Sequence, residues 1–196
     1  MKTLLITVLI LFSAYTFAES LPAEKARGIF LAIGVGPRMP IGQFGNSSDL
    51  GYGANIELAY TDNEYLPLFL FAKAGFETFP GSQSLYQQSD YSNLSTNAIP
   101  VSLGARYYFK PLVESIVLII PIVEASVQLN YFMKLNQFKT SSGRSNYNEE
   151  NSKLGFNVGA GFSMFMLEIL ASYNFFQTNQ YLGFDLKVRL PLYINL

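Results

Sequence analysis

The chain has 196 residues, of which 49% are hydrophobic and only 14% are charged, and its formal net charge is −1. It contains neither cysteine nor histidine, which excludes disulfides, thiolate chemistry and the usual general base and metal ligand near neutral pH. An ordinary soluble domain carries about 25% charged residues and a nucleic-acid-binding domain carries a basic patch. Neither class fits this composition, so we expect the apolar side chains to face something other than a protein core.

The first 18 residues predict a secretory signal peptide. Lys2 gives a positive start, Leu4–Phe12 is the apolar segment, and a small residue, Ala18, ends the cleavage site;. We therefore expect cleavage after Ala18, a short N-terminal segment over residues 19–26, and one domain over residues 27–196.

Eight later stretches alternate apolar and polar residues with a period of two, which is the signature of β-strands with one apolar face. In chain order these stretches are 28–36, 51–60, 67–78, 98–109, 121–134, 153–162, 167–175 and 181–196. The closing stretch illustrates the pattern, because Phe184, Leu186 and Val188 alternate there with Asp185, Lys187 and Arg189.

The stretch 112–133 is the best alternative as a membrane-spanning helix, and it is rejected. Its uncharged run, Ser115–Val123, is shorter than the roughly 20 residues that a span requires, and Pro121 lies within it;. From Pro121 onward the residues alternate instead, which favours a strand.

The connections between the predicted strands are long and short in turn. The long ones, rich in Ser, Asn, Gln, Gly and Tyr, are 37–50, 79–97 and 136–152, and the short ones are 61–66, 110–116 and 163–166. The last outer connection, about 176–181, is also short. This order predicts an all-β fold, an eight-stranded antiparallel up-and-down barrel with both ends of its wall beside the short turns.

The polar face of these strands indicates that it points into the barrel. It carries most of the strand glycines, which weaken an exposed strand but leave room for large side chains inside a narrow barrel. It also carries equal numbers of acids and bases, as an enclosed lumen requires. The acids are Glu57, Glu77, Glu124, Glu168 and Asp185, and the bases are Lys73, Arg106, Lys134, Lys187 and Arg189. We expect these ten residues to form a charge network in the lumen.

The aromatic residues gather near the two ends of the predicted strands, as in the two girdles of a membrane barrel. The predicted girdle at the short turns is Tyr60, Tyr65, Phe69, Tyr107, Tyr108 and Phe109; the one at the long loops is Phe79, Tyr131, Phe132, Tyr173, Phe175, Phe176 and Tyr181. The alternative is a soluble sandwich with these rings in its core.

The signal peptide, the eight alternating strands and the final strand resemble the small outer-membrane β-barrel proteins of Gram-negative bacteria, the OmpA/OmpX-like, porin-type superfamily. The resemblance implies a transmembrane barrel in the cell outer membrane. It also implies periplasmic chaperones and a barrel-assembly machinery that recognises the last strand. The corresponding assembly signal here is Leu190, Leu192, Ile194 and Leu196. The family usually ends on Phe or another aromatic residue, and this chain departs from that pattern at Leu196.

Functional expectations follow from the predicted barrel. Enzyme activity is not expected, because the barrel enzymes that act on lipids rely on a histidine. No cofactor or metal is expected either. We expect a monomer with a plugged lumen and a structural or surface-interaction role, in contact with lipid and lipopolysaccharide. A narrow channel for small solutes and a soluble periplasmic ligand-binding barrel remain as alternatives.

Overall fold

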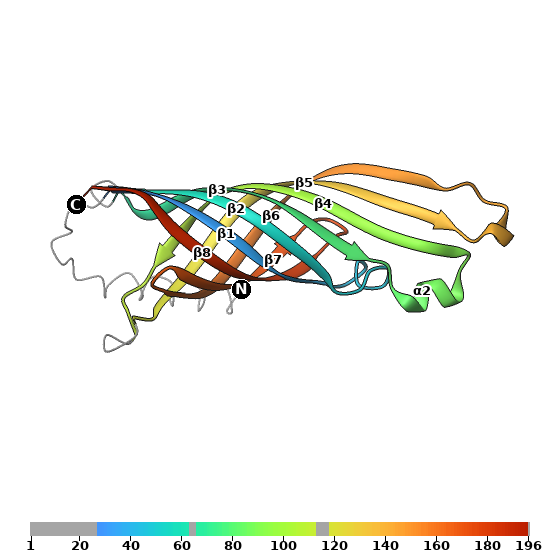
Figure 1. The fold of residues 1–196 in the computed structure, drawn as a ribbon, viewed down its shortest axis with the longest axis horizontal. Coiled ribbons are helices and arrows are strands. Elements are labelled where there is room, and N and C mark those ends of the chain that lie inside the picture. The colour runs from blue at the N-terminus through green and yellow to red at the C-terminus, as the bar shows by residue number, and fades with distance from the viewer. Residues whose placement is uncertain (1–26, 63–65, 113–117, 196) are drawn as a thin grey trace, which may run out of the picture.

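The structure, a computed structural model, describes residues 27–62, 66–112 and 118–195. The predicted signal peptide, residues 19–26 and Leu196 lie outside these residues. Eight antiparallel strands follow one another around a barrel, which closes because the first strand pairs with the last (Figure 1). The strands are β1 (Arg27–Pro40), β2 (Gly51–Asp62), β3 (Leu66–Pro80), β4 (Tyr91–Tyr108), β5 (Ile120–Phe138), β6 (Tyr147–Met164), β7 (Leu167–Phe175) and β8 (Tyr181–Asn195). The predicted fold is confirmed, strand by strand.

In the described part of the chain, the helical segments between the strands are short. A helix, α2 (Gln83–Gln88), precedes β4, and a 3-10 turn, η1 (Thr140–Ser142), lies between β5 and β6. Among the described residues there is no helix whose length and apolar content suit a membrane crossing.

Alternation along each strand separates two kinds of surface. On β8, Phe184, Leu186 and Val188 are 42–52% exposed on the outside of the barrel. Their neighbours Lys187 and Arg189 are 0% and 7% exposed. The fold is therefore apolar outside and polar inside, the reverse of a soluble protein.

Three strands continue past the closed barrel and form an extension, defined here as residues 91–97 of β4, 133–138 of β5 and 147–152 of β6, with α2 (Figure 1). Pairing of β6 with β7 stops at Phe156↔Phe175, whereas pairing of β6 with β5 continues to Tyr147↔Asn136. The prediction of irregular loops over 79–97 and 136–152 is thus wrong in part. These strand segments carry mostly polar residues at both parities, so no apolar alternation marks them in the sequence;.

Candidate functional site

Arg106 of β4 lies at the centre of the barrel lumen, where its side chain is completely buried. Its Nη1 and Nη2 atoms donate to the two carboxylate oxygens of Glu57, each at 2.8 Å. Its Nε atom donates to Glu124 at 2.9 Å, and Nη1 also donates to Glu168 at 3.2 Å. The guanidinium lies 5.1 Å from the ring centroid of Phe71. One arginine thus joins carboxylates from three other strands, in the bidentate geometry that arginine favours.

Further cations from β3 and β8 complete this central network. Lys187 Nζ donates to Glu57 at 2.8 Å, and Arg189 reaches both Glu57 and Glu168 at 3.2 Å. Lys73 Nζ lies 3.4 Å from Glu124. Because each of these three carboxylates meets at least two cations, the charges offset much of one another's desolvation cost.

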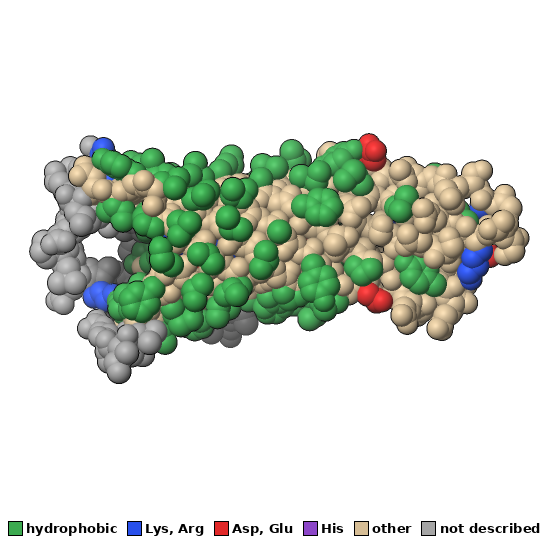
Figure 2. All heavy atoms as spheres, viewed as in Figure 1, with side chains coloured by type: hydrophobic (Ala, Val, Ile, Leu, Met, Phe, Trp, Pro, Cys, Tyr) green, Lys and Arg blue, Asp and Glu red, His purple; other side chains and the backbone are tan. Residues whose placement is uncertain are grey.

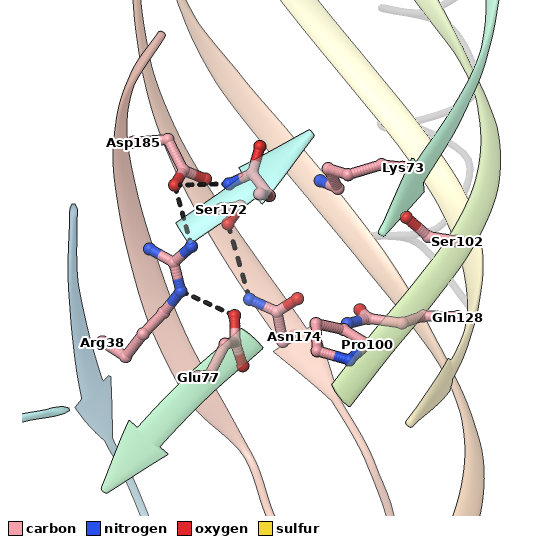
Figure 3. Close-up of a pocket in the computed structure, with 10 residues that line it drawn as sticks. Arg38, Lys73, Glu77, Pro100, Ser102, Gln128, Ser172, Asn174 and Asp185 are labelled. Atoms are coloured by element: carbon pink, nitrogen blue, oxygen red, sulfur yellow. Dashed lines mark hydrogen bonds and ion pairs between the residues drawn. The ribbon is translucent and has the colours of Figure 1, made fainter. Parts of the chain in front are cut away.

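Arg38 of β1 organises a second charged cluster nearer the long loops (Figure 3). Its Nε atom donates to Glu77 at 2.7 Å and its Nη2 atom to Asp185 at 2.8 Å. Asn55 Nδ2 also donates to Asp185, at 3.0 Å. All four side chains are buried, so this cluster closes the lumen at a second level.

Glycines give these long side chains their space. A Cβ atom on Gly34 would lie 2.8 Å from Lys187 Cγ, and one on Gly53 would lie 2.9 Å from Arg38 Nε. Alanine at either position would therefore force a buried cation to shift. The small inward residues make room for the large ones, as expected for an eight-stranded barrel.

The remaining space in this part of the lumen is a cavity of about 20 Å³ beside Arg38, Lys73 and Gln128. Asn55 Oδ1, Glu77 Oε2 and Ser102 Oγ are buried without a protein partner in the described chain, and all three residues line the cavity. A cavity that holds a water needs about 10–15 Å³ and several polar partners. The space therefore suits a single water and is too small for a solute.

Aromatic side chains close the lumen toward the long loops. This loop-end aromatic cluster consists of Phe44, Phe79, Phe132, Phe176 and Tyr181, all 0–4% exposed. Phe44 comes from the β1–β2 connection, and its ring centroid lies 4.8 Å from that of Phe79. The β1–β2 connection therefore packs a buried phenyl ring into the loop end of the barrel.

A second cluster closes the lumen toward the short turns. This turn-end aromatic cluster consists of Phe30, Phe69 and Tyr108, and the Arg189 guanidinium lies 5.4–5.8 Å from all three ring centroids. Tyr108 Oη also donates to Glu168 at 2.6 Å. The charged network is thus enclosed between two aromatic layers.

The predicted aromatic girdles are therefore wrong for several residues. Phe79, Phe132, Phe176 and Tyr181 are inside the barrel, and Phe69 and Tyr108 belong to the turn-end aromatic cluster. Tyr60 and Phe109, which are 40% and 45% exposed, do lie on the outside. Tyr65 lies outside the described residues. Nearness to a strand end does not determine the direction of a side chain, whereas parity along the strand does.

Nine of the ten charged residues predicted for the lumen lie within these two clusters, and Lys134 does not. Lys134 lies in the extension, opposite Glu149, and forms no ion pair within the part of the chain that the structure describes. Lys134 lies beyond the last pairing of β6 with β7, so its inward parity does not bring it into an ion pair with the carboxylates of the two clusters. Arg38 is the fifth base of the lumen instead of Lys134, so the five acids are still matched by five bases. The predicted first strand ends at Gly36 and therefore omits Arg38. Extending that strand by two residues, with the same alternation, would include Arg38 on its inward face.

The predicted assembly signal lies on the outside of β8. Leu190, Leu192 and Ile194 are 43%, 58% and 51% exposed, and Leu196 lies outside the described residues. These side chains therefore sit where a partner could reach them without unfolding the barrel wall.

The charged lumen has the chemistry of a structural network. Each of its five carboxylates is held in an ion pair. Within residues 27–62, 66–112 and 118–195, no three His, Cys, Asp or Glu side chains gather in a group that could hold a metal ion.

Comparisons with known proteins find similarity of fold alone. No protein-family model and no curated protein matches the chain. Among solved structures it is similar to Neisserial surface protein A, with 15% identity, 85% of this chain and 99% of the other covered, and a TM-score of 0.46. It is also similar to the N-terminal β-barrel domain of Pseudomonas aeruginosa OprF, with 13% identity, 85% of this chain and 100% of the other covered, and a TM-score of 0.45. A third similar structure is the attachment invasion locus protein Ail of Yersinia pestis in complex with the heparin analogue sucrose octasulfate. Its identity is 14%, the match covers 85% of this chain and 99% of the other, and the TM-score is 0.43.

Proposed function

We propose that this chain is an integral protein of the bacterial outer membrane, with a closed lumen and a structural or surface-interaction role. The observation that carries the proposal is the inverted distribution of side chains. Large apolar residues such as Leu103 and Leu154, 66% and 72% exposed, cover the outside, while Glu57 and Lys187 are at most 1% exposed. Exposed apolar surface on this scale is rare in soluble monomers and typical of lipid-facing walls.

The extent of the apolar surface supports the same proposal. On the face seen in Figure 2, hydrophobic side chains are spread over the barrel, whereas the end formed by the extension is mostly polar. A membrane barrel has such an apolar band below longer external segments. A soluble barrel that binds an apolar ligand would carry the opposite arrangement, with its apolar face enclosing the ligand.

The filled lumen favours a structural or adhesive role over transport. The side chains of the two charged clusters and the two aromatic clusters fill the path that a solute would take. The cavity of about 20 Å³ between them is too small for a solute. In this proposal the chain works as a monomer, without cofactor or catalysis. Periplasmic chaperones and the assembly machinery deliver it, through Leu190, Leu192 and Ile194, and its extension meets lipopolysaccharide or other surface partners.

Cell fractionation and electrical recording test the location and the closed lumen together. We expect the protein in the outer-membrane fraction, with a gel mobility that shifts on heating, because a closed barrel stays folded in detergent. The same material in planar bilayers should give no steady conductance. Recovery in the soluble periplasmic extract would refute the membrane location, and steady conductance would refute the closed lumen.

Shortening the extension tests its role at the surface. Asn136 and Tyr147 are paired across β5 and β6, so residues 137–146 can be replaced by Asn-Gly, which favours a two-residue hairpin turn. This removes the cations Lys139 and Arg144. We expect binding to lipopolysaccharide-containing vesicles to weaken by about tenfold, since a charge-assisted hydrogen bond contributes about 1.5–3 kcal/mol.

A matched control places the same dipeptide at the other end of the barrel. Phe165 and Met166 form the two-residue turn between β6 and β7, where Phe165 has a φ of 53°. Asn-Gly tolerates that conformation, so this variant should fold and bind as the unaltered protein does. If both variants bind equally well, the extension has no role in the interaction.

A further inference from the structure

The outer face of the barrel contains an apolar groove of about 440 Å³ near the short turns. Its floor is Ala72 of β3, which is paired with Leu58 on one side and Leu103 on the other. Ile29, Tyr60 and Leu70 continue the walls toward the turns. The groove exists because a single small residue interrupts a row of leucines, and its volume is in the range of ligand sites, about 300–1,000 Å³.

A charged pair lies beyond the Tyr60 end of this groove. Tyr60 Oη donates to Asp62 Oδ2 at 3.0 Å, and Arg27 Nε donates to the same oxygen at 2.8 Å. The Arg27 side chain is 49% exposed and that of Asp62 is 12% exposed. Tyr60 therefore links an apolar channel on the barrel wall to an accessible cation and a carboxylate.

We infer that this groove binds one acyl chain of a phospholipid whose zwitterionic phosphoethanolamine headgroup lies at Arg27 and Asp62. The inference rests on the proposed membrane location. The headgroup's phosphate matches the Arg27 guanidinium, and its ammonium matches the Asp62 carboxylate. An anionic headgroup without an ammonium would lack this second match and would approach the Asp62 charge unfavourably.

Other occupants fit less well. Lipopolysaccharide is anionic and belongs to the leaflet beside the extension, at the other end of the barrel. A second copy of the chain would have to insert an apolar ridge into the groove, and its retention is an outcome of the test.

Native mass spectrometry of the purified barrel tests the inference, with palmitoyl-oleoyl phosphatidylethanolamine and phosphatidylglycerol as probes. We expect one retained phosphatidylethanolamine and about tenfold less phosphatidylglycerol. Ala72→Phe fills the groove and should lower retention by about tenfold or more, because the loss of roughly two buried methylenes has that effect. The control is Ala74→Phe, at the next outward position on β3, which lies outside the groove lining;.

A second pair of variants tests the headgroup contact without altering the groove. Arg27→Gln should abolish the preference for phosphatidylethanolamine, whereas Lys110→Gln, at another exposed cation near the short turns, should preserve it. Equal retention by the Ala72 and Ala74 variants, equal retention of both lipids by the unaltered protein, or a retained second copy would overturn the inference. Heat-shifted mobility of every variant, measured in parallel, shows whether the barrel itself is intact, so a failed groove is distinguishable from a failed membrane proposal.

Discussion

Replacing Arg106 with methionine is expected to destabilise the folded barrel by about 3–5 kcal/mol, the usual cost of leaving buried charges without their partner. Methionine keeps an unbranched side chain but removes the donors to Glu57, Glu124 and Glu168. Three carboxylates would then remain in the lumen with only Lys73, Lys187 and Arg189 as their cations. Urea unfolding in lipid vesicles, followed by heat-shifted mobility, measures the loss.

Lys73→Met is the matched control for Arg106→Met. Lys73 is 13% exposed and makes one long ion pair, 3.4 Å from Glu124, so its loss should cost less by about 2 kcal/mol or more. The double variant Arg106→Met/Glu124→Gln should recover part of the stability, because it removes one stranded charge. Equal unfolding midpoints for the two single variants would contradict a network centred on Arg106.

Val188→Arg is expected to lower the folding yield in lipid vesicles far more than Lys187→Gln. Val188 is 45% exposed on the outer face of β8, and an arginine on the lipid face costs up to about 2–4 kcal/mol, depending on its depth in the bilayer. Lys187 contributes a single ion pair to Glu57, which keeps its contacts with Arg106 and Arg189.

Val188→Leu controls for the change in size at the same position. It should fold with the yield of the unaltered protein, since it keeps an apolar side chain against lipid. If Val188→Arg and Lys187→Gln gave the same yield, the assignment of lipid and lumen faces on β8 would be incorrect.

The architecture is predictable because the membrane imposes a strict rule on the wall. Each strand must present apolar residues at every second position, and that period is visible in the amino-acid sequence. The same rule places Glu57, Arg106 and Glu168 on the inside, where they meet. Their pairing across strands cannot be predicted, because it depends on the stagger of the sheet as it closes.

The wrong predictions have a common cause, which is that apolar residues mark only part of each alternating strand. Phe79 shares the parity of Lys73 and Glu77, so the rule places it inside, although its position near a strand end suggests a girdle. Arg38 continues the alternation of β1 between Pro37 and Met39, in a segment that the prediction assigned to a connection, and it is therefore overlooked. Beyond the last pairing of β6 with β7, inward parity no longer brings a side chain into the charge network, which is why Lys134 has the inward parity but no ion pair among the described residues.

The two aromatic clusters separate the lumen charges from the ions of the solutions on either side. Salt screens exposed charges over about 8 Å at physiological ionic strength, but it screens enclosed pairs much less. The fully buried pair of Arg106 and Glu57 should therefore keep its strength in dilute and in saline surroundings alike. The pair of Arg27 and Asp62, in which the Arg27 side chain is half exposed, should weaken as the salt concentration rises.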